Sequence, residues 1–325
     1  MRLLIYETSF RRIEAGIAAI NADRPGAVEP VVMAADGSFP TDDSSADAAW
    51  MNGDVFFTPH ARDFSRAILK SPDLAWVQSG AAGFDNPVFK MIVDKGARLT
   101  TSHGQAIGMS EYVLWGVLDH FQGGPARRSD QASRTWGRHR FREIKDSRWL
   151  IVGFGAIGQA VAERARGFGA HITAVRRNPA AHAAADAITT LDDLPTHLPQ
   201  ADVVVLCCPL TDQTRHLADA PFFARMKPGS VLVNVGRGGL VDEPALLAAL
   251  GSTPEHAVLD VFETEPLLAD SPFWAHPNVT LTPHASGVTD GQGARNDTLF
   301  LENLRRFVEG LPLLHEARPE DVRAG

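Results

Sequence analysis

The stretch that decides the fold of this chain is Arg148-Trp149-Leu150-Ile151-Val152-Gly153-Phe154-Gly155-Ala156-Ile157-Gly158. An apolar run ends in Gly-x-Gly-x-x-Gly and leads into a helix-forming run, which predicts a strand, a tight turn and a helix. Gly153 permits the turn, Gly155 lets the backbone approach a pyrophosphate, and Gly158 lets the helix lie close to the strand. A phosphate would then meet the unpaired N–H groups of the helix N-terminus. The stretch predicts a dinucleotide site, with a purely structural glycine turn as the alternative.

The composition places the chain among globular proteins. It has 325 residues, of which 44% are apolar and 22% charged, so two domains are expected. The net charge of −8 argues against a nucleic-acid partner, and no apolar run is long enough for a membrane span. Cys207 and Cys208 are adjacent in an apolar run, where we expect buried thiols and neither a disulfide nor a metal site. A cytoplasmic location is expected.

Short apolar runs alternate with helix-like runs along both parts of the chain, which predicts α/β architecture with parallel sheets covered on both faces. Strands are expected at Leu3–Tyr6, Val31–Ala34, Asp54–Phe57, Trp76–Gln78, Ala97–Thr100, 149–152, His171–Val175, Val203–Cys208, Ser230–Val235, Ala257–Val261 and Val279–Thr282.

Three helices are marked clearly. Residues 105–121 are apolar and free of proline, which predicts a buried helix leading into the second domain. Asp242 suits the N-cap of a helix that stops at Gly251, and residues 290–309 form a last long helix. The basic stretch 127–148, which carries Trp136, is expected to wrap a surface.

Two arginines occupy the end of the strand that follows the glycine motif. An NAD site usually has an acidic residue there, whereas this chain has Arg176 and Arg177. A guanidinium pairs with a 2′-phosphate that a carboxylate would repel, so these residues favour NADP over NAD. The alternative is a solvated pair of surface arginines.

Three further residues follow predicted strands and have suitable chemistry. Arg237 lies between glycines, where a guanidinium would hold a carboxylate or, alternatively, pair with a neighbouring acid. His284 suits proton transfer near neutral pH. Glu265 is the candidate carboxylate that would hold the ring of His284 and favour its protonated form.

These motifs, in this order, resemble the D-isomer-specific 2-hydroxyacid dehydrogenase family. The matching segments are Val152-Gly153-Phe154-Gly155-Ala156-Ile157-Gly158, Asn234-Val235-Gly236-Arg237-Gly238, Leu259-Asp260-Val261-Phe262-x-x-Glu265-Pro266-Leu267 and Pro283-His284. The resemblance covers essentially the whole chain. It implies two doubly wound parallel-sheet domains: a Rossmann cofactor domain, residues 104–288, inserted into a flavodoxin-like substrate domain, residues 1–103 plus 289–325.

The resemblance implies an NAD(P)-dependent enzyme with Arg237, Glu265 and His284 as catalytic residues. His284 would protonate the alkoxide that forms from the ketone. Glu265 would orient the ring of His284, and Arg237 would bind the 2-oxo acid. The cofactor would be NADP, with NAD possible. Its expected contacts are Gly153, Phe154, Gly155, Ala156, Ile157, Gly158, Arg176, Arg177, Cys208, Pro209, Val235, Gly236 and Asp260. The substrate carboxylate would meet backbone N–H groups of Ala81, Ala82 and Gly83.

The arginine pair and the run Phe273-Trp274-x-His276-Pro277-Asn278 are similar to glyoxylate/hydroxypyruvate reductases, which implies a short 2-oxo acid as substrate and a homodimer. Trp136 would enter the partner subunit's site or pack at the dimer interface. His103 stands where the family more often has proline. It would contact the substrate or cap the long helix, and we favour the capping role. A nucleotide-sensing binding protein of the same fold, and a dehydrogenase of another small acid such as phosphite, are the alternative functions.

Overall fold

The computed structural model describes residues 1–84 and 86–324 and divides the chain into two compact units. Unit 1 comprises Met1–Gln105 with the described part of Asp290–Gly325, and unit 2 comprises Ala106–Thr289. The chain therefore enters unit 2 once and leaves it once. The crossing points expected from the sequence lie within about two residues of these borders. Within the described residues, every helix is too short or too polar to span a lipid bilayer.

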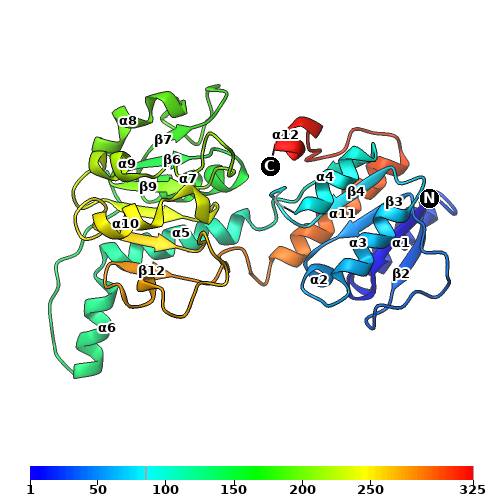
Figure 1. Ribbon diagram of the computed structural model, residues 1–325, viewed down its shortest axis with the longest axis horizontal. Coiled ribbons are helices and arrows are strands. Elements are labelled where there is room, and N and C mark those ends of the chain that lie inside the picture. The colour runs from blue at the N-terminus through cyan, green and yellow to red at the C-terminus, as the bar shows by residue number, and fades with distance from the viewer. Residues whose placement is uncertain (85, 325) are drawn as a thin grey trace. The chain divides into compact units, whose positions relative to one another are not determined.

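The sheet of unit 1 has five parallel strands in the order β2-β1-β3-β4-β5, the doubly wound order of flavodoxin-like folds (Figure 1). They are β1 (Arg2–Tyr6), β2 (Glu29–Met33), β3 (Ala48–Met51), β4 (Trp76–Ser79) and β5 (Arg98–Thr100). Helices cover both faces, so β1 is buried on both sides and reads as a continuous apolar run.

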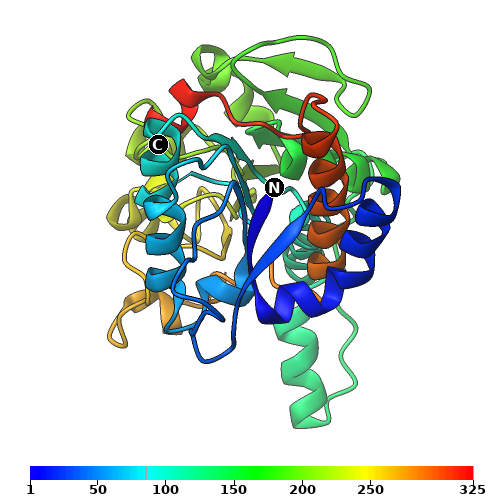
Figure 2. The same cartoon turned by 90° about the vertical axis from the view of Figure 1, so that its right-hand side faces the viewer.

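One face of this sheet packs against α1 (Glu7–Asp23) and α11 (Gln292–Val308), which lie side by side in Figure 2. Trp50 of β3 stacks on Phe300 of α11 with ring centroids 4.7 Å apart, so the last long helix completes the core of unit 1. The opposite face is covered by α2 (Gly53–Phe56), α3 (Ala61–Lys70), α4 (Pro87–Asp94) and α12 (Pro319–Ala324).

The strand expected at Asp54–Phe57 was wrong, because this segment forms the short helix α2 and the strand lies earlier, at Ala48–Met51. The side chain of Asn52 accepts the backbone N–H of Asp54 at 3.1 Å, which starts a helical turn. Alanines give β3 little strand propensity of their own, but its position in the sheet interior buries every residue.

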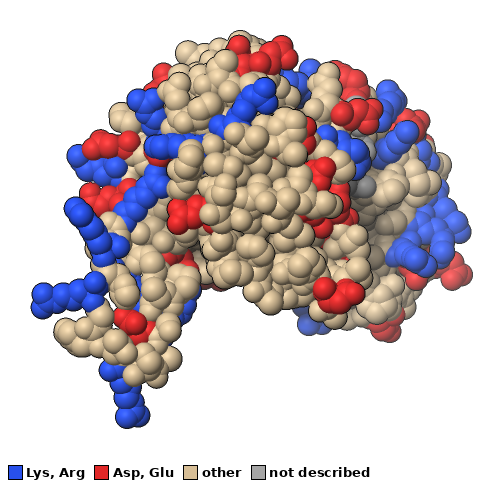
Figure 3. Space-filling model, turned by 60° about the vertical axis from the view of Figure 1, so that its left-hand side comes forward, with Lys and Arg blue, Asp and Glu red and all other residues tan. Residues whose placement is uncertain are grey.

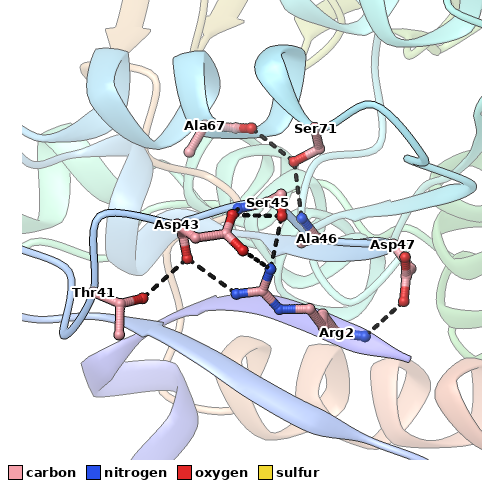
Figure 4. A network of polar contacts seen from close by, with 8 residues as sticks. All are labelled: Arg2, Thr41, Asp43, Ser45, Ala46, Asp47, Ala67 and Ser71. Carbon is pink, nitrogen blue, oxygen red and sulfur yellow. Dashed lines mark hydrogen bonds and ion pairs between the residues drawn. The ribbon is translucent and has the colours of Figure 1, made fainter.

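A polar network ties the loop before β3 to the first strand (Figure 4). The guanidinium of Arg2 donates to the Asp43 carboxylate at 2.6 Å and to Ser45 Oγ at 2.7 Å. The backbone N–H of Arg2 donates to Asp47 at 2.7 Å. The backbone N–H of Ala46 donates to Ser71 Oγ, so the loop is held from the side of α3 as well. These contacts fix where β3 begins.

The sheet of unit 2 has seven parallel strands in the order β12-β11-β10-β9-β6-β7-β8, the Rossmann order extended by one strand. They are β6 (Arg148–Val152), β7 (His171–Val175), β8 (Ala187–Thr189), β9 (Val203–Leu206), β10 (Val231–Asn234), β11 (His256–Leu259) and β12 (Val279–Leu281). All were expected except β8, whose residues are partly exposed at the sheet edge and carry little apolar signal.

The helices of unit 2 cover both faces of this sheet. On one face lie α5 (Ala106–Phe121) and α7 (Ala156–Gly167), and on the other lie α8 (Leu194–His197), α9 (Ala220–Arg225) and α10 (Glu243–Ala249). The N-cap predicted for α10 is confirmed, because Asp242 accepts the N–H of Ala245 at 3.0 Å. The helix α6 (Gly124–Ser133) projects away from the sheet of this unit (Figure 1).

Candidate functional site

The strands of unit 2 end in register at one edge of the sheet. A row of paired residues crosses it in the order Val175, Val152, Leu206, Asn234, Leu259 and Leu281. The residues directly after this row are Arg176, Gly153, Cys207, Val235, Asp260 and Thr282. The carboxyl edge of a parallel sheet is where α/β folds bind ligands. The register therefore gathers the turns that carry the predicted cofactor and catalytic residues of unit 2.

The glycine motif forms a close turn with an open outer side. A Cβ on Gly153, whose φ is +101°, would lie 2.4 Å from the Cys208 nitrogen. A Cβ on Gly158 would lie 2.2 Å from the Gly153 oxygen, whereas one on Gly155 would meet nothing within 4 Å. Among the described residues, no side chain caps the N-terminus of α7. This open N-terminus with unpaired N–H groups fits a pyrophosphate.

The remaining residues of the motif support this turn. Ala156 is the first residue of α7, and Ile157 packs against the core between α5 and the sheet. Phe154 is buried with its ring edge-on to His182, at a centroid distance of 5.3 Å. These contacts hold the glycine turn rigidly against the sheet.

The two arginines follow β7, next to the glycine turn. Arg176 is half-buried, and its backbone N–H donates to the Thr189 oxygen at 3.0 Å, which anchors it beside β8. No ion pair with Arg176 occurs among the described residues, while Arg177 is exposed. The chemistry of this position fits a phosphate on the adenosine side of a dinucleotide.

Two further turns border the glycine motif. Cys208 lies against Gly153, with Pro209 following, and a Cβ on Gly236 would lie 3.1 Å from the Cys208 oxygen. Val235, just before Gly236, is buried. Burial raises the pKa of the Cys208 thiol to about 11, and burial also raises the pKa of the Cys207 thiol. Both thiols are therefore protonated and unreactive at neutral pH.

Arg237 lies at the carboxyl end of β10. It is half-buried, and its Nη1 donates to the Gly236 oxygen at 2.7 Å. Asn234 Nδ2 donates to the Arg237 oxygen at 3.0 Å, which fixes the backbone. A Cβ on Gly238 would lie 1.8 Å from the Phe262 carbonyl carbon, so only glycine allows this loop to pack on the turn after β11.

His284 and Glu265 contact each other directly. His284 Nδ1 lies 2.7 Å from Glu265 Oε2, and the other carboxylate oxygen of Glu265 accepts the N–H of Phe262 at 3.0 Å. The carboxylate is thus held at both oxygens, so it orients the ring and leaves Nε2 to act on a ligand. The side chain of His284 is about half exposed, at 52%, so a ligand has access to it.

The turn that carries His284 is fixed by the buried carboxylate of Asp260, which is 1% exposed. This carboxylate accepts the N–H groups of Ala285 and Ser286 and the hydroxyls of Thr282 and Ser286. The Asp260 carbonyl accepts the N–H of His284 at 2.8 Å, and His284 adopts a left-handed φ of +51°. Asp260 therefore positions the turn, a role the sequence did not predict; its contact with a cofactor remains a prediction.

Tyr112 of α5 supports the same turn, since its hydroxyl lies 2.8 Å from Thr282 Oγ1, within hydrogen-bond distance. Burial raises the pKa of Tyr112 to about 12, and the nearby Asp260 carboxylate acts in the same direction. The phenol is therefore a neutral structural group. Among the described residues, no group of His, Cys, Asp and Glu has the arrangement of a metal site.

The predicted carboxylate loop lies in unit 1, after β4. The Ala81 N–H donates to Ser79 Oγ at 3.0 Å, so the structure departs from the prediction that it faces a ligand. The expected contact of the Ala82 and Gly83 N–H groups with a substrate carboxylate stays a prediction. Asn296 of α11 and Asn52 pack against Gly80, which fixes the loop at its base.

The helix-capping role expected for His103 was wrong. Ser102 Oγ, and not the imidazole, accepts the N–H of Gly104 ahead of α5. The ring of His103 contacts His315 instead, with centroids 4.3 Å apart, which no sequence signal indicated. Trp136 is 93% exposed on the segment that follows α6, so it belongs to no core within its own chain.

Comparison with known proteins identifies the family. Residues 114–286 match the family model described as "D-isomer specific 2-hydroxyacid dehydrogenase, NAD binding domain". An (S)-sulfolactate dehydrogenase from Chromohalobacter salexigens is 36% identical over 248 residues, covering 74% of this chain and 80% of the relative. A glyoxylate/hydroxypyruvate reductase B from Citrobacter koseri is 48% identical over 164 residues. That match spans 49% of this chain and 50% of the reductase.

Solved structures agree over nearly the whole chain. An NADPH-dependent glyoxylate/hydroxypyruvate reductase from Sinorhizobium meliloti, in complex with NADP and sulfate, superposes with a TM-score of 0.80 at 27% identity, covering 99% of both chains. A D-isomer specific 2-hydroxyacid dehydrogenase from Xanthobacter autotrophicus, in complex with NADPH and MES, gives a TM-score of 0.78 at 29% identity, covering 98% and 99%.

The chain belongs to the D-isomer specific 2-hydroxyacid dehydrogenase family. It is therefore an NAD(P)-dependent oxidoreductase, and the resemblance drawn from the sequence motifs is confirmed.

Proposed function

We propose that this protein uses NADPH to reduce a short 2-oxo acid of the glyoxylate or hydroxypyruvate type to the D-2-hydroxy acid. The observation that carries the proposal is the 2.7 Å contact of His284 Nδ1 with Glu265 Oε2, at the sheet edge that also carries the open glycine turn. A positioned acid beside a dinucleotide turn is what carbonyl reduction needs.

When bound at the glycine turn, the nicotinamide cofactor would supply the hydride for the carbonyl carbon of the substrate. Glu265 holds the Nδ1 side of His284, so Nε2 donates its proton to the oxygen that becomes the hydroxyl. Arg237 binds the substrate through its carboxylate and carbonyl oxygens in a forked contact. For unit 1, the resemblance to the family supports a proposal of its own, that the N–H groups of Ala82 and Gly83 bind a substrate carboxylate. One hydride and one proton are added in all, which converts the ketone to the alcohol.

The function is tested by following NADPH oxidation with glyoxylate, hydroxypyruvate and larger 2-oxo acids. We expect turnover in the wild type. The His284→Asn variant should lose roughly a hundredfold to ten-thousandfold in kcat, the usual contribution of a general acid, while it still binds NADPH. If the His284→Asn variant kept the wild-type kcat, another group would have to be the general acid.

The proposed preference for NADPH over NADH rests on Arg176, and less on Arg177. The Arg176→Ala variant should raise the KM for NADPH about tenfold or more and leave that for NADH within about twofold, because only NADPH carries the 2′-phosphate. An equal rise in the KM for NADPH and for NADH would show that Arg176 does not bind the 2′-phosphate and is a solvated surface residue.

We also propose a homodimer, formed in a reducing, cytoplasmic compartment. Helix α6 and the segment after it, residues 124–142, are rich in Arg on a chain of net charge −8 and project from the unit (Figure 3). Trp136 in this segment is exposed. An open groove of about 750 Å³ beside α5, lined in part by Trp115, Leu118 and Phe168, offers a second copy an apolar surface. Light scattering should give twice the mass of one chain for the wild type. The Trp136→Asp variant should shift the measured mass toward that of the monomer.

A dehydrogenase of another small acid is the second candidate, supported by the 36% identity to the sulfolactate dehydrogenase. A non-catalytic nucleotide sensor is the third. It would bind NADPH without turnover of any 2-oxo acid, so the assay of the wild type separates it from both enzymes.

A further inference from the structure

Another histidine–carboxylate pair lies within unit 2, close in sequence to the residues proposed to carry the reaction. His216 Nε2 contacts Glu263 Oε1. His216 belongs to the segment after β9, and Glu263 lies in the turn after β11, two residues before Glu265. In the sheet, β10 lies between these two strands, and its carboxyl end carries the loop of Arg237. The His216–Glu263 pair therefore joins the two turns that flank the Arg237 loop.

The segment that carries His216 is held in place by its own hydrogen bonds. The Thr214 hydroxyl donates to the Pro209 oxygen at 2.7 Å, which closes a turn. The His216 N–H donates to the Gly239 oxygen at 2.8 Å, so the segment is also bonded to the loop after β10. His216 has a left-handed φ of +50°, a conformation that is costly for a residue with a Cβ and persists only where the surroundings impose it. The position from which the ring reaches Glu263 is therefore fixed.

The turn that carries Glu263 leads directly to the pair of Glu265 and His284. The Glu263 N–H donates to Glu243 Oε1 at 2.8 Å. The N–H of the preceding residue, Phe262, donates to Glu265 Oε1 at 3.0 Å, and Glu265 Oε2 lies 2.7 Å from His284 Nδ1. A shift of Glu263 would move the Phe262 amide, and with it the carboxylate that contacts His284.

The His216–Glu263 pair has more influence on geometry than on stability. Its side chains are 44% and 34% exposed, and an ion pair in such a place adds little to the free energy of folding. Proton transfer, in contrast, is sensitive to misplacements of about 1 Å in the groups that carry it. The packing leaves no slack to absorb such a shift, since a Cβ on Gly238 would lie 1.8 Å from the Phe262 carbonyl carbon.

A second carboxylate near Glu263 makes a partner for its side chain useful. Burial raises the pKa of Glu243; the hydrogen bond from the Glu263 N–H opposes this shift, and repulsion from the Glu263 carboxylate adds to it. The two carboxylates therefore repel each other across the turn. The imidazole of His216 offers Glu263 a hydrogen-bond donor on the side of the β9 segment, which holds the side chain against this repulsion.

We propose that the His216–Glu263 pair fixes the position of Glu265, and through it the orientation of His284, for proton transfer to the substrate. The proposal rests on the proposed function, because it names positioning residues for the same reaction. His216 and Glu263 are not catalytic residues in this proposal, since they act only through the turn at 262–265.

The test measures kcat and the KM for NADPH with glyoxylate and hydroxypyruvate as substrates. His216→Asn should lower kcat roughly tenfold and leave the KM for NADPH within about twofold, because the turn shifts while the glycine motif stays in place. Asparagine tolerates the left-handed backbone but is too short to reach Glu263. Glu263→Ala removes the same contact from the other side and should have the same effect. Glu263→Gln can still accept a hydrogen bond from the ring and should keep most of kcat.

A double-mutant cycle separates the pair from two unrelated effects. The variant with both His216→Asn and Glu263→Ala should lose no more kcat than either single variant, because each change removes the same contact. The matched control is Arg166→Gln, which breaks a similarly exposed ion pair with Asp186 at the end of α7 remote from the glycine motif, and it should leave kcat unchanged. Additive losses, a wild-type kcat in both single variants, or a loss seen only in the KM for NADPH would overturn the role of the pair.

The ring of His284 reports the same positioning without a substrate. The proton NMR signal of its Nδ1–H, identified by its loss in His284→Asn, should shift in His216→Asn and Glu263→Ala and stay unchanged in Arg166→Gln. A signal that stays unchanged in the first two variants would overturn the role of the pair and leave the proposed function intact. An absence of turnover by the wild type with every 2-oxo acid would overturn both, because no proton transfer would remain for the pair to support.

Discussion

The carboxylate of Asp260 is the most heavily hydrogen-bonded acceptor around His284. It is almost completely buried, and every contact found for it goes to the turn at 282–286. A buried carboxylate is tolerated only where such donors surround it. It therefore fixes the left-handed backbone at His284 and, through it, the direction in which the imidazole points.

We expect Asp260→Asn to lower kcat about tenfold to a hundredfold, because an amide opposes one of the N–H donors of the turn with its own NH₂ group. Steady-state kinetics measure this effect.

The Asp242→Asn variant is the matched control. Asp242 also accepts a backbone N–H, but asparagine caps helices equally well, so kcat should be unchanged. A rise in the KM for NADPH with normal kcat in Asp260→Asn would instead favour direct contact of Asp260 with the cofactor.

At the residue scale, the sequence predicted which side chains carry chemistry but not all of their contacts. The pairing of Glu265 with His284 was predicted from their types and positions, and the structure contains it. The Ala81 N–H was assigned to a ligand but donates to Ser79, and His103 contacts His315 in place of the helix. The Ser79 hydroxyl competes with a ligand for the Ala81 N–H, and the His315 ring competes with the helix for His103. Such contacts depend on the tertiary structure and cannot be read from the sequence.

Among the elements, the β6–α7 connection depends on glycine for two separate reasons. Gly158 has no room for a side chain, because a Cβ would press on the backbone of Gly153. Gly155 has room, and its side is open to a ligand. The first glycine therefore serves packing, and the second serves the approach of the cofactor.

The pair Gly155→Ala and Gly158→Ala separates these reasons. Gly155→Ala should leave the melting temperature without cofactor within about 2 °C and weaken NADPH binding about tenfold or more, since the new methyl group occupies cofactor space. Gly158→Ala should lower the melting temperature by several degrees and weaken NADPH as well. Calorimetry with and without NADPH measures both. If the Gly155→Ala variant bound NADPH normally, the pyrophosphate would not bind against Gly155.

The elements that the sequence missed share a physical cause. The strand at Ala48–Met51 has no β-branched residue, and the edge strand β8 is only three residues long and partly exposed, so their place in a sheet defines them. The apolar run at Asp54–Phe57 had the composition of a strand, but the cap supplied by Asn52 made it helical. Local composition decides an element only where no capping contact or sheet neighbour opposes it.

At the scale of the whole molecule, buried histidines link stability to pH. His256 is 5% exposed, its ring stacks on His120 at 4.4 Å, and its Nε2 lies 3.0 Å from Thr280 Oγ1. Burial, followed by repulsion from His120, lowers the pKa of His256 to about 4, while Asp119 opposes and His276 adds to this shift. The unfolded chain binds this proton near the ordinary value of 6.5, and the folded chain does not.

The free energy of unfolding should therefore fall as the pH drops from about 6.5 to about 4, by roughly 3 kcal/mol from this group, and level off below. Urea unfolding at pH 7 and pH 4.5 measures this loss. His256→Asn should lose correspondingly less between the two pH values, because asparagine takes up no proton. A variant with the pH dependence of the wild type would show that other groups, such as His120, carry the effect.

The sequence by itself determined the family, the two parallel sheets and nearly all of their strands, because apolar periodicity and glycine spacing act over a few neighbouring residues. Only the tertiary structure decided the row of strand ends that aligns the turns of unit 2, the clamp of Asp260 on the His284 turn, and the meeting of His103 with His315. Each of these depends on strand register or on contacts between distant segments, and no local pattern encodes either one.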